Sequence, residues 1–404
     1  MQKKLMAVAV AGALGAPAAA LAQTATVQMY GTVVLNYNYV DSGPRAGAHT
    51  RTDMMNAHDA NIGFRGEEKL GGGLSAWFQC ESSLDLTGED SAGNGFCARN
   101  SGIGLKGAFG NIFLGIWDTP MKLVAAPARP FSTSGIYGMG SLLWNESGSN
   151  VGNVLVVDGV TIGNATSFTR RQNNTVNWHS PVWNGFQVLA AFSSADEATR
   201  GADVPNTLSK PRLWSVGASY SSGPLYLAAG YERHKNYNPG GPAGTALAAY
   251  AATGGGDDSG WNILGSYQIG PFKASLYFTR LKYENTNGAG ASLKTNNWAV
   301  YGDWRIQGPH TLRLGYTVAG DGKGTPGGAN VNSIAAPTAA GVTDSGAKLF
   351  GVQYAYAFSK RTEINLGFAR LDNESRSRHR LQTAGPRNAG QDQDAWQVGF
   401  RHRF

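Results

Sequence analysis

The sequence predicts an all-β fold, a transmembrane antiparallel β-barrel of about sixteen strands. Three observations predict it: an exported N-terminus, an alternation of short turns with long loops, and a last strand with one apolar and one polar face. Glycine accounts for 56 of 404 residues and charged residues for 15%. This composition disfavours a helical protein and also a nucleic-acid partner, because nucleic-acid binders concentrate Lys and Arg.

Residues 1–22 have the order of a secretory signal peptide. Lys3 and Lys4 precede a short Ala/Val/Leu/Gly run, and Ala20-Leu21-Ala22 supplies the small residues of a cleavage site. The alternative is an N-terminal membrane helix, which the short, Ala-rich run disfavours. We therefore expect residues 1–22 to be removed and residues 23–404 to form one barrel domain.

The first strand is expected at residues 23–40, where apolar and polar side chains alternate. A polar loop to about residue 57 and a returning strand at residues 59–68 follow. Alternation is also clear at 186–192, 261–269, 298–304, 312–318 and 350–358.

Short turns alternate with long loops, as one-sided insertion into a membrane requires. The short turns lie near residues 72, 107–111, 180–185, 221–224, 270–272, 307–310 and 359–362. Aromatic residues stand at many strand ends, where membrane interfaces place them. A soluble β-sandwich alternates in the same way. The exported N-terminus and the apolar last strand favour the barrel.

The last strand is expected at residues 394–404. One parity carries most of its apolar side chains: Trp396, Val398, Phe400, His402 and Phe404. An open strand edge invites pairing with other chains. Pairing of this strand with the first strand would close the sheet and remove the edge.

The two cysteines, Cys80 and Cys97, are expected to form a disulfide. They lie close in sequence around a Gly/Ser/Asp-rich loop, and export would bring them into an oxidising compartment. A metal site would need more ligands than this neighbourhood offers. Cys80 shares parity with Phe78, so the bridge is expected to join neighbouring strands near the outer rim and away from the pore.

The longest interruption of the strand pattern is residues 118–168. Loops of this length are usually functional, and the Leu, Met, Phe and Trp side chains here favour burial. We expect this third loop to fold inward and narrow the lumen; the alternative is an exposed surface loop.

Several segments together resemble the general (Gram-negative type) porins of β-proteobacteria, which are trimeric sixteen-stranded channels of the outer membrane. The matching segments are Tyr30-Gly31, NIGFRGEEKLGGGLSAWFQCESSL at 61–84, ARNSGIGLKGAFGNIFLG at 98–115, RQNNTVNWHSP at 171–181 and GFRHRF at 399–404. The resemblance implies an outer-membrane location, a homotrimer surrounded by lipid and lipopolysaccharide, and an inward third loop.

The resemblance also implies a constriction in which wall arginines face loop carboxylates. The candidate pore-lining residues are Arg65, Glu81, Arg99, Asp118, Arg129, Arg171 and Arg313. Arg99 shares parity with Ile103 and Leu105, so it reaches the lumen only if a bulge intervenes. The family commonly has arginines where this chain has Asn61 and Ile116.

The expected function is passive diffusion of small hydrophilic solutes and ions through a water-filled channel, with a mild preference for anions. The alternative is a substrate-specific channel for an aromatic acid, another organic anion or a sugar. Its track would be formed by Trp117, Phe131, Tyr137 and Trp144. An enzyme is disfavoured, because the sequence lacks the HExxH and GxSxG motifs. No cofactor or metal is expected.

A basic run lies in the last long loop and consists of Arg376, Arg378, His379, Arg380 and Arg387. It is expected to attract anionic solutes or lipopolysaccharide phosphates. The alternative is an ordinary solvated loop surface.

Overall fold

The computed structural model describes residues 27–43, 49–88, 95–132, 135–144, 155–157, 160–162, 168–194, 212–237, 256–284, 292–325, 342–381 and 388–404. The predicted signal peptide, residues 1–22, lies outside the described residues.

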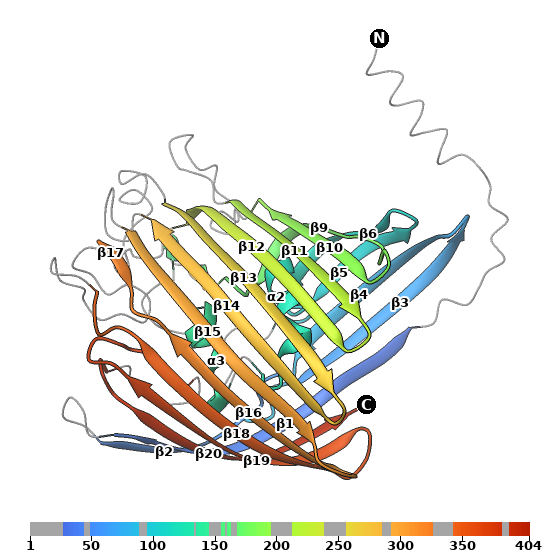
Figure 1. The fold of residues 1–404 in the computed structure, drawn as a ribbon. Helices are drawn as coiled ribbons and strands as arrows, with labels where there is room; N and C mark the ends of the chain where they lie inside the picture. The colour runs from blue at the N-terminus through green and yellow to red at the C-terminus, as the bar shows by residue number, and fades with distance from the viewer. Residues whose placement is uncertain are drawn as a thin grey trace.

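Eighteen strands form one antiparallel sheet that closes on itself (Figure 1). They are β1 (Gln28–Ser42), β2 (Thr50–Asn56), β3 (Asn61–Gly71), β4 (Leu74–Ser83), β5 (Ser101–Gly107), β6 (Gly110–Asp118), β9 (Arg171–His179), β10 (Phe186–Ser193), β11 (Arg212–Ser222), β12 (Leu225–Tyr237), β13 (Gly256–Ile269), β14 (Phe272–Glu284), β15 (Ser292–Arg305), β16 (His310–Ala319), β17 (Lys323–Thr325), β18 (Ala347–Ala357), β19 (Thr362–Asn373) and β20 (Gln393–Arg403).

Two positions in the barrel are each occupied by two consecutive strands, β2 with β3 and β16 with β17, in place of one long strand. β2 and β3 pair with opposite ends of β1, and β16 and β17 pair with opposite ends of β15. Eighteen strands therefore make a closed barrel of sixteen, and the predicted fold class is confirmed. The expected polar loop before residue 57 was wrong in part, because β2 occupies Thr50–Asn56. Its charged and polar side chains concealed the strand.

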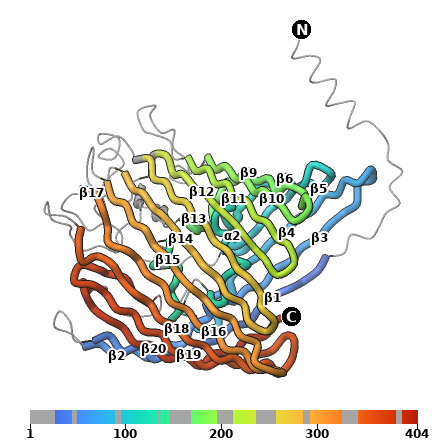
Figure 2. The backbone as a smooth tube through the Cα atoms, viewed as in Figure 1, coloured from blue at the N-terminus to red at the C-terminus, as the bar shows by residue number. Residues whose placement is uncertain are grey.

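The barrel closes between its first and last strands, as predicted. β1 and β20 pair continuously from Thr32↔Arg403 to Ser42↔Gln393 (Figure 2). Trp396 and Phe400 are 46% and 45% exposed on the outer face. Phe404 continues the seam, since its N–H donates to Gly31 O at 3.1 Å.

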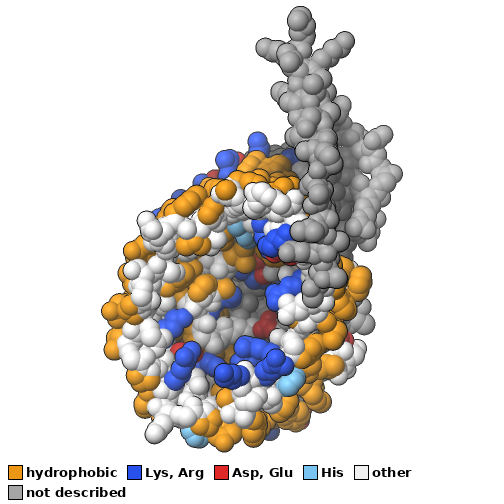
Figure 3. Space-filling model, turned by 90° about the vertical axis from the view of Figure 1, so that its right-hand side faces the viewer, with side chains coloured by type: hydrophobic (Ala, Val, Ile, Leu, Met, Phe, Trp, Pro, Cys, Tyr) orange, Lys and Arg blue, Asp and Glu red, His pale blue; other side chains and the backbone are white. Residues whose placement is uncertain are grey.

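Side chains alternate between an apolar outer face and a polar inner face. On β14, Leu276 is 63% exposed whereas its neighbour Ser275 is buried. One end view shows hydrophobic side chains around the outside and Lys and Arg side chains around a central hollow (Figure 3). This sorting is what lipid outside and water inside require.

Tight turns at one end of the barrel use residues that accept a left-handed backbone. Gly71, Gly72 and Gly73 have φ values of 88°, 58° and 80°. Glycine adopts this conformation without the steric cost that other residues bear. These turns explain how long strands reverse within a few residues.

A helical segment lies inside the ring of strands (Figure 1). It comprises α2 (Pro120–Ala125), η2 (Ala126–Ala128), η3 (Gly135–Tyr137) and α3 (Met139–Trp144). We call residues 119–132 and 135–144 the inner segment. β7 (Leu155–Val157) and β8 (Val160–Ile162) form a separate hairpin. No helix among the described residues is long and apolar enough to cross a membrane.

Hydrogen bonds join the inner segment to the inner wall. The Tyr226 and Tyr277 hydroxyls each donate at 2.7 Å, to Val124 O and Ala125 O. Asn297 Nδ2 donates to Leu143 O at 3.0 Å. These bonds satisfy helix-end carbonyls that would otherwise be buried without partners.

Glycines on the inner wall allow the segment to approach closely. A Cβ atom placed at Gly217 would lie 2.7 Å from Val124 Cγ1. One at Gly315 would lie 2.7 Å from Phe131 Cε2, and one at Gly367 only 1.7 Å from the Tyr137 hydroxyl oxygen. The absence of these side chains creates the space in which Phe131 and Tyr137 pack.

Candidate constriction site

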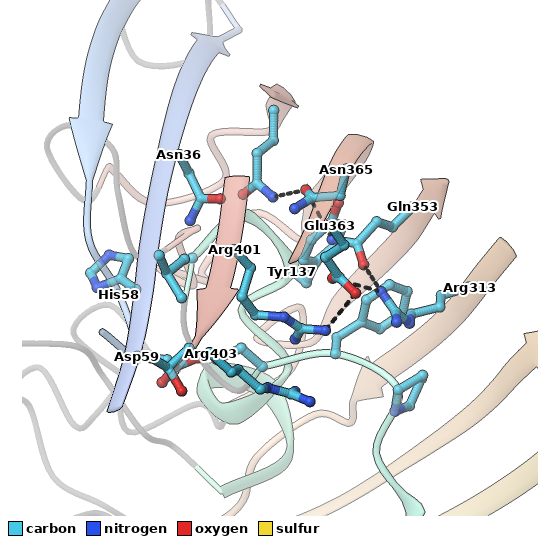
Figure 4. Close-up of a pocket in the computed structure, with 17 residues that line it drawn as sticks. Asn36, His58, Asp59, Tyr137, Arg313, Gln353, Glu363, Asn365, Arg401 and Arg403 are labelled. Carbon is cyan, nitrogen blue, oxygen red and sulfur yellow. Dashed lines mark hydrogen bonds and ion pairs between the residues drawn. The ribbon is translucent and has the colours of Figure 1, made fainter. Parts of the chain in front are cut away.

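A cavity of about 250 Å³ lies between the inner segment and the wall beside the seam (Figure 4). Phe131 and Tyr137 border it from the inner segment, and their stacked ring centroids are 4.5 Å apart. Burial raises the pKa of the Tyr137 phenol above its ordinary value, so the ring presents a neutral hydroxyl. The opposite side of the cavity is charged.

Four residues of that charged side form what we call the seam cluster: Arg313, Glu363, Arg401 and Arg403. Arg401 Nη2 lies 2.7 Å from Glu363 Oε2, and Arg313 Nη1 lies 3.8 Å from Glu363 Oε1. Arg313 also contacts Asp303, with Nε 3.5 Å from Oδ2. Glu363 therefore compensates two arginines, whereas Arg403 forms none of the salt bridges found among the described residues.

A second group, the wall cluster, consists of Glu81, Arg99, Asn100, Asp118 and Arg171. Arg99 Nε lies 2.7 Å from Glu81 Oε1. Asn100 links the other members: its Oδ1 accepts from Arg171 Nε at 2.8 Å, and its Nδ2 donates to Asp118 Oδ2 at 3.1 Å. One amide thus holds a cation and an anion in fixed positions.

Asp118 connects the wall cluster to the inner segment. Its Oδ1 lies 3.2 Å from Lys122 Nζ on α2 and 3.5 Å from Arg171 Nε. All three side chains are less than a quarter exposed. Partly buried ion pairs are screened less by salt than exposed ones, so this contact fixes the start of the inner segment.

Arg99 reaches the lumen through an irregularity at the start of β5. The β4–β5 ladder ends at Gln79↔Gly102, and its regular continuation would place Arg99 opposite Ser82 on the outer face. Instead, the Arg99 N–H donates to Glu81 O at 2.9 Å. This shift of one residue in the strand register turns the Arg99 side chain toward the lumen, which is what a bulge at this position was expected to do.

Arg65 lies beside the wall cluster and contacts neutral groups, of which Tyr30 donates its hydroxyl to Glu81 Oε2 at 3.1 Å. Its Nε and Nη2 donate to Gln28 Oε1 at 3.0 and 2.8 Å, and its Cζ lies 5.0 Å from the Tyr30 ring centroid. No salt bridge among the described residues includes it. Its charge is therefore not offset by a contacting carboxylate.

Arg129 and two residues of the expected aromatic track, Trp117 and Trp144, pack against other aromatic side chains and do not border the 250 Å³ cavity. Arg129 packs over the Trp144 ring, with Cζ 5.7 Å from its centroid, and is not among the residues that line the cavity. Trp144 is 0% exposed, so its place in a solute track was wrong. Trp117 packs against Trp77 and Phe113 and borders another cavity.

The disulfide is present as predicted, with the Cys80 and Cys97 Cα atoms 4.7 Å apart. Cys80 follows Phe78 on the outer parity of β4, and Phe78 is 40% exposed. The bridge therefore lies on the side of the wall away from the lumen.

Much of the basic run is folded into the loop structure. Arg376 N–H donates to Asp344 O at 2.8 Å, and His379 O accepts from Asn373 Nδ2 at 2.8 Å. Burial lowers the pKa of the Arg380 guanidinium from its ordinary value. Arg387 lies outside the described residues.

Sequence reasoning missed Glu363, Asn100 and Lys122. Glu363 alternates with Ile364 and Leu366, so strand parity could have placed it in the lumen. Asn100 and Lys122 lie beside irregular backbone, where parity carries no information.

A family model described as "Gram-negative porin" matches residues 7–376. The chain belongs to this porin family. The porin is 28% identical over 411 residues to outer membrane porin protein 32 of Delftia acidovorans, with 100% of both chains covered. It is 30% identical over 254 residues to an outer membrane porin protein of Bordetella pertussis, covering 58% of this chain and 60% of that protein.

Solved structures agree with this assignment. The anion-selective porin from Comamonas acidovorans has a TM-score of 0.70 and 25% identity, with 94% of this chain and 100% of that chain covered. A trimer form of OmpT from Vibrio cholerae has a TM-score of 0.60 at 15% identity, which shows the fold alone. The predicted family, pore-forming function and outer-membrane location are confirmed.

Proposed function

We propose that the porin is a passive diffusion channel for small hydrophilic solutes and that an excess of cationic side chains gives it a mild preference for anions. The observation that carries this proposal is the charge balance around the lumen. At the cavity, Arg313, Arg401 and Arg403 face the carboxylates of Glu363 and Asp59, and Asp303 also contacts Arg313, so the charges there balance. Along the wall that carries the wall cluster and Arg65, the cations outnumber the carboxylates: Arg65, Arg99, Lys106, Lys122 and Arg171 against Glu67, Glu81 and Asp118.

Fixed charges act strongly in a narrow pore. A solute that passes the constriction loses part of its hydration, and the low-dielectric wall weakens screening of each charge. Paired charges largely cancel each other at a distance. Arg65 and Arg403 are therefore the side chains we assign the largest share of the preference.

Planar-bilayer recording tests this assignment. The wild-type channel should show stepwise conductance and, under a salt gradient, a reversal potential that favours anions. The variant R65Q/R403Q should shift that potential toward cations. R233Q is the matched control, because Arg233 lies on the outer rim beside Asp257. Absence of stepwise conductance would contradict the channel, and an unchanged potential in R65Q/R403Q would contradict the charge assignment.

The remaining parts of the proposal concern the whole loop and the assembly. We assign residues 118–168 together the role of the constriction, and residues 1–22 that of a cleaved signal. We further propose a homotrimer in contact with lipid and lipopolysaccharide, supported by the trimer form reported for OmpT. Native mass spectrometry of the detergent-extracted protein should give a trimer of chains that begin near residue 23.

A second candidate function is preferential uptake of an aromatic acid. A cavity of about 410 Å³ on the inner wall is lined by Arg65, by Lys106 with its ion-pair partner Glu67, and by Trp77 and Trp117. These groups could contact a carboxylate and a ring. Saturable flux of an aromatic acid, blocked by its analogues and not by a cyclohexane acid, would favour this function over general diffusion.

A further inference from the structure

The disulfide lies beside the register shift that brings Arg99 into the lumen. Cys80 precedes Glu81, the carboxylate that Arg99 contacts, and Cys97 lies two residues before Arg99. The bridge faces outward while the Arg99–Glu81 ion pair faces inward. The two contacts therefore hold the same piece of backbone from opposite sides of the wall.

One backbone hydrogen bond, from Arg99 N–H to Glu81 O, holds this piece of backbone, and the remaining bonds come from side chains and not from a regular ladder. The Cys97 N–H donates to Ser82 Oγ at 2.9 Å, and the Glu81 N–H donates to Ser101 Oγ at 2.9 Å. Both bonds replace a ladder carbonyl with a side-chain hydroxyl. Cys97 also has a left-handed backbone, with φ of 59°, which is uncommon for a residue other than glycine.

The regular register would be the ordinary alternative for these residues. It would set Arg99 opposite Ser82, on the parity of Ile103 and Leu105, which are 65% and 43% exposed on the outer face. Arg99 would then leave Glu81, and the lumen would lose one positive charge while it kept the negative one.

We propose that the Cys80–Cys97 disulfide is a positioning device for Arg99 and thereby sets part of the ion preference of the channel. This inference rests on the proposed anion preference. Reduction by a phosphine in water cleaves the S–S bond, gives two thiols and converts the phosphine to its oxide. The freed segment then samples arrangements in which Arg99 is withdrawn, so reduction weakens the preference for anions.

Reversal potentials of four proteins test the proposal: wild type, C80S/C97S, R99Q and C80S/C97S/R99Q. C80S/C97S should shift the potential toward cations, and R99Q should shift it at least as far. Removal of the cysteines in the R99Q background should add nothing, because the charge that they position is absent. A disulfide with a purely structural role would give equal shifts in both backgrounds, or none, and would overturn the proposal.

Treatment of wild-type channels already inserted in the bilayer avoids any folding defect of the variants. Tris(2-carboxyethyl)phosphine should shift the potential of the wild type and leave that of C80S/C97S unchanged. A wild type with anion preference that does not shift after verified reduction would contradict the role of the disulfide alone. A wild type without anion preference would instead contradict the proposed function.

Discussion

Glu363 compensates two lumen arginines, so its charge should limit the anion preference. In E363Q, Arg313 and Arg401 lose their closest shared partner. One unit charge about 5 Å from a passing ion contributes about 0.8 kcal/mol in water, which is about a fourfold effect on each ion. Loss of the carboxylate favours the anion and disfavours the cation, so the anion-to-cation permeability ratio should rise by roughly sixteenfold. Reversal potentials under a salt gradient measure this ratio.

The matched control for E363Q is D372N, which removes a carboxylate from the outer wall, where Asp372 pairs with Arg370. It should leave the ratio unchanged. Equal shifts in both variants would mean that total charge, and not the position of Glu363, determines selectivity.

Gly367 leaves the space that the Tyr137 hydroxyl occupies. A Cβ atom at this position would lie 1.7 Å from that oxygen, so G367A must push the ring toward the cavity. We expect a smaller single-channel conductance. Overpacking should also lower the free energy of unfolding by about 1–3 kcal/mol. Conductance steps and thermal unfolding measure the two effects.

Two variants accompany G367A. In G302A, the added Cβ would meet the Phe272 ring at 3.1 Å, away from the inner segment, so conductance should stay at the wild-type value. In G367A/Y137F, loss of the hydroxyl should restore part of the conductance. Equal conductance in all three proteins would mean that Tyr137 does not narrow the pore.

These residues show when alternation along a strand predicts which side chains face the lumen. Alternation with Ile364 and Leu366 fixes the face of Glu363. Inward glycines such as Gly367 carry no such signal, because their role depends on a segment distant in sequence. Alternation alone places Arg99 on the outer face, and only the register shift beside the disulfide brings it into the lumen.

At the scale of elements, the last residue of the chain contributes to closure of the barrel. Phe404 exchanges two backbone hydrogen bonds with Gly31, at 3.1 and 3.2 Å. Deletion of Phe404 should lower the free energy of unfolding by about 1 kcal/mol per lost bond, with a further loss from its ring. The temperature at which the folded band disappears in gel electrophoresis measures this change.

F358A is the comparison for this deletion, because Phe358 is 63% exposed and lies beside a short turn. Its unfolding temperature should change less. A larger effect of F358A would indicate that apolar outer surface, and not seam pairing, dominates stability.

The elements that alternate most clearly were predicted best. The last strand, the short turns and the sixteen-strand count follow from period-two patterns and from glycine in turns. β2 was missed because Thr50–Asn56 has no apolar face. The path of the inner segment was not predictable in detail, because contacts such as Tyr226 to Val124 join residues far apart in the chain.

At the scale of the whole molecule, the proposed preference should depend on salt. The Debye length falls from about 10 Å at 0.1 M to about 3 Å at 1 M. At a constant concentration ratio, the anion preference should therefore be strong in dilute salt and weak in concentrated salt. A preference that does not change with concentration would indicate sieving by size in place of charge.

The pairing of β1 with β20 also has a consequence for synthesis and export. Strands β1 and β20, which are far apart in sequence, supply the two halves of one junction, so a product that ends before β20 cannot close its wall in this way. Until β20 has been made, the edge of β1 that pairs with it keeps unsatisfied backbone groups. A shortened product would lack the partner for that edge and would be prone to join another molecule.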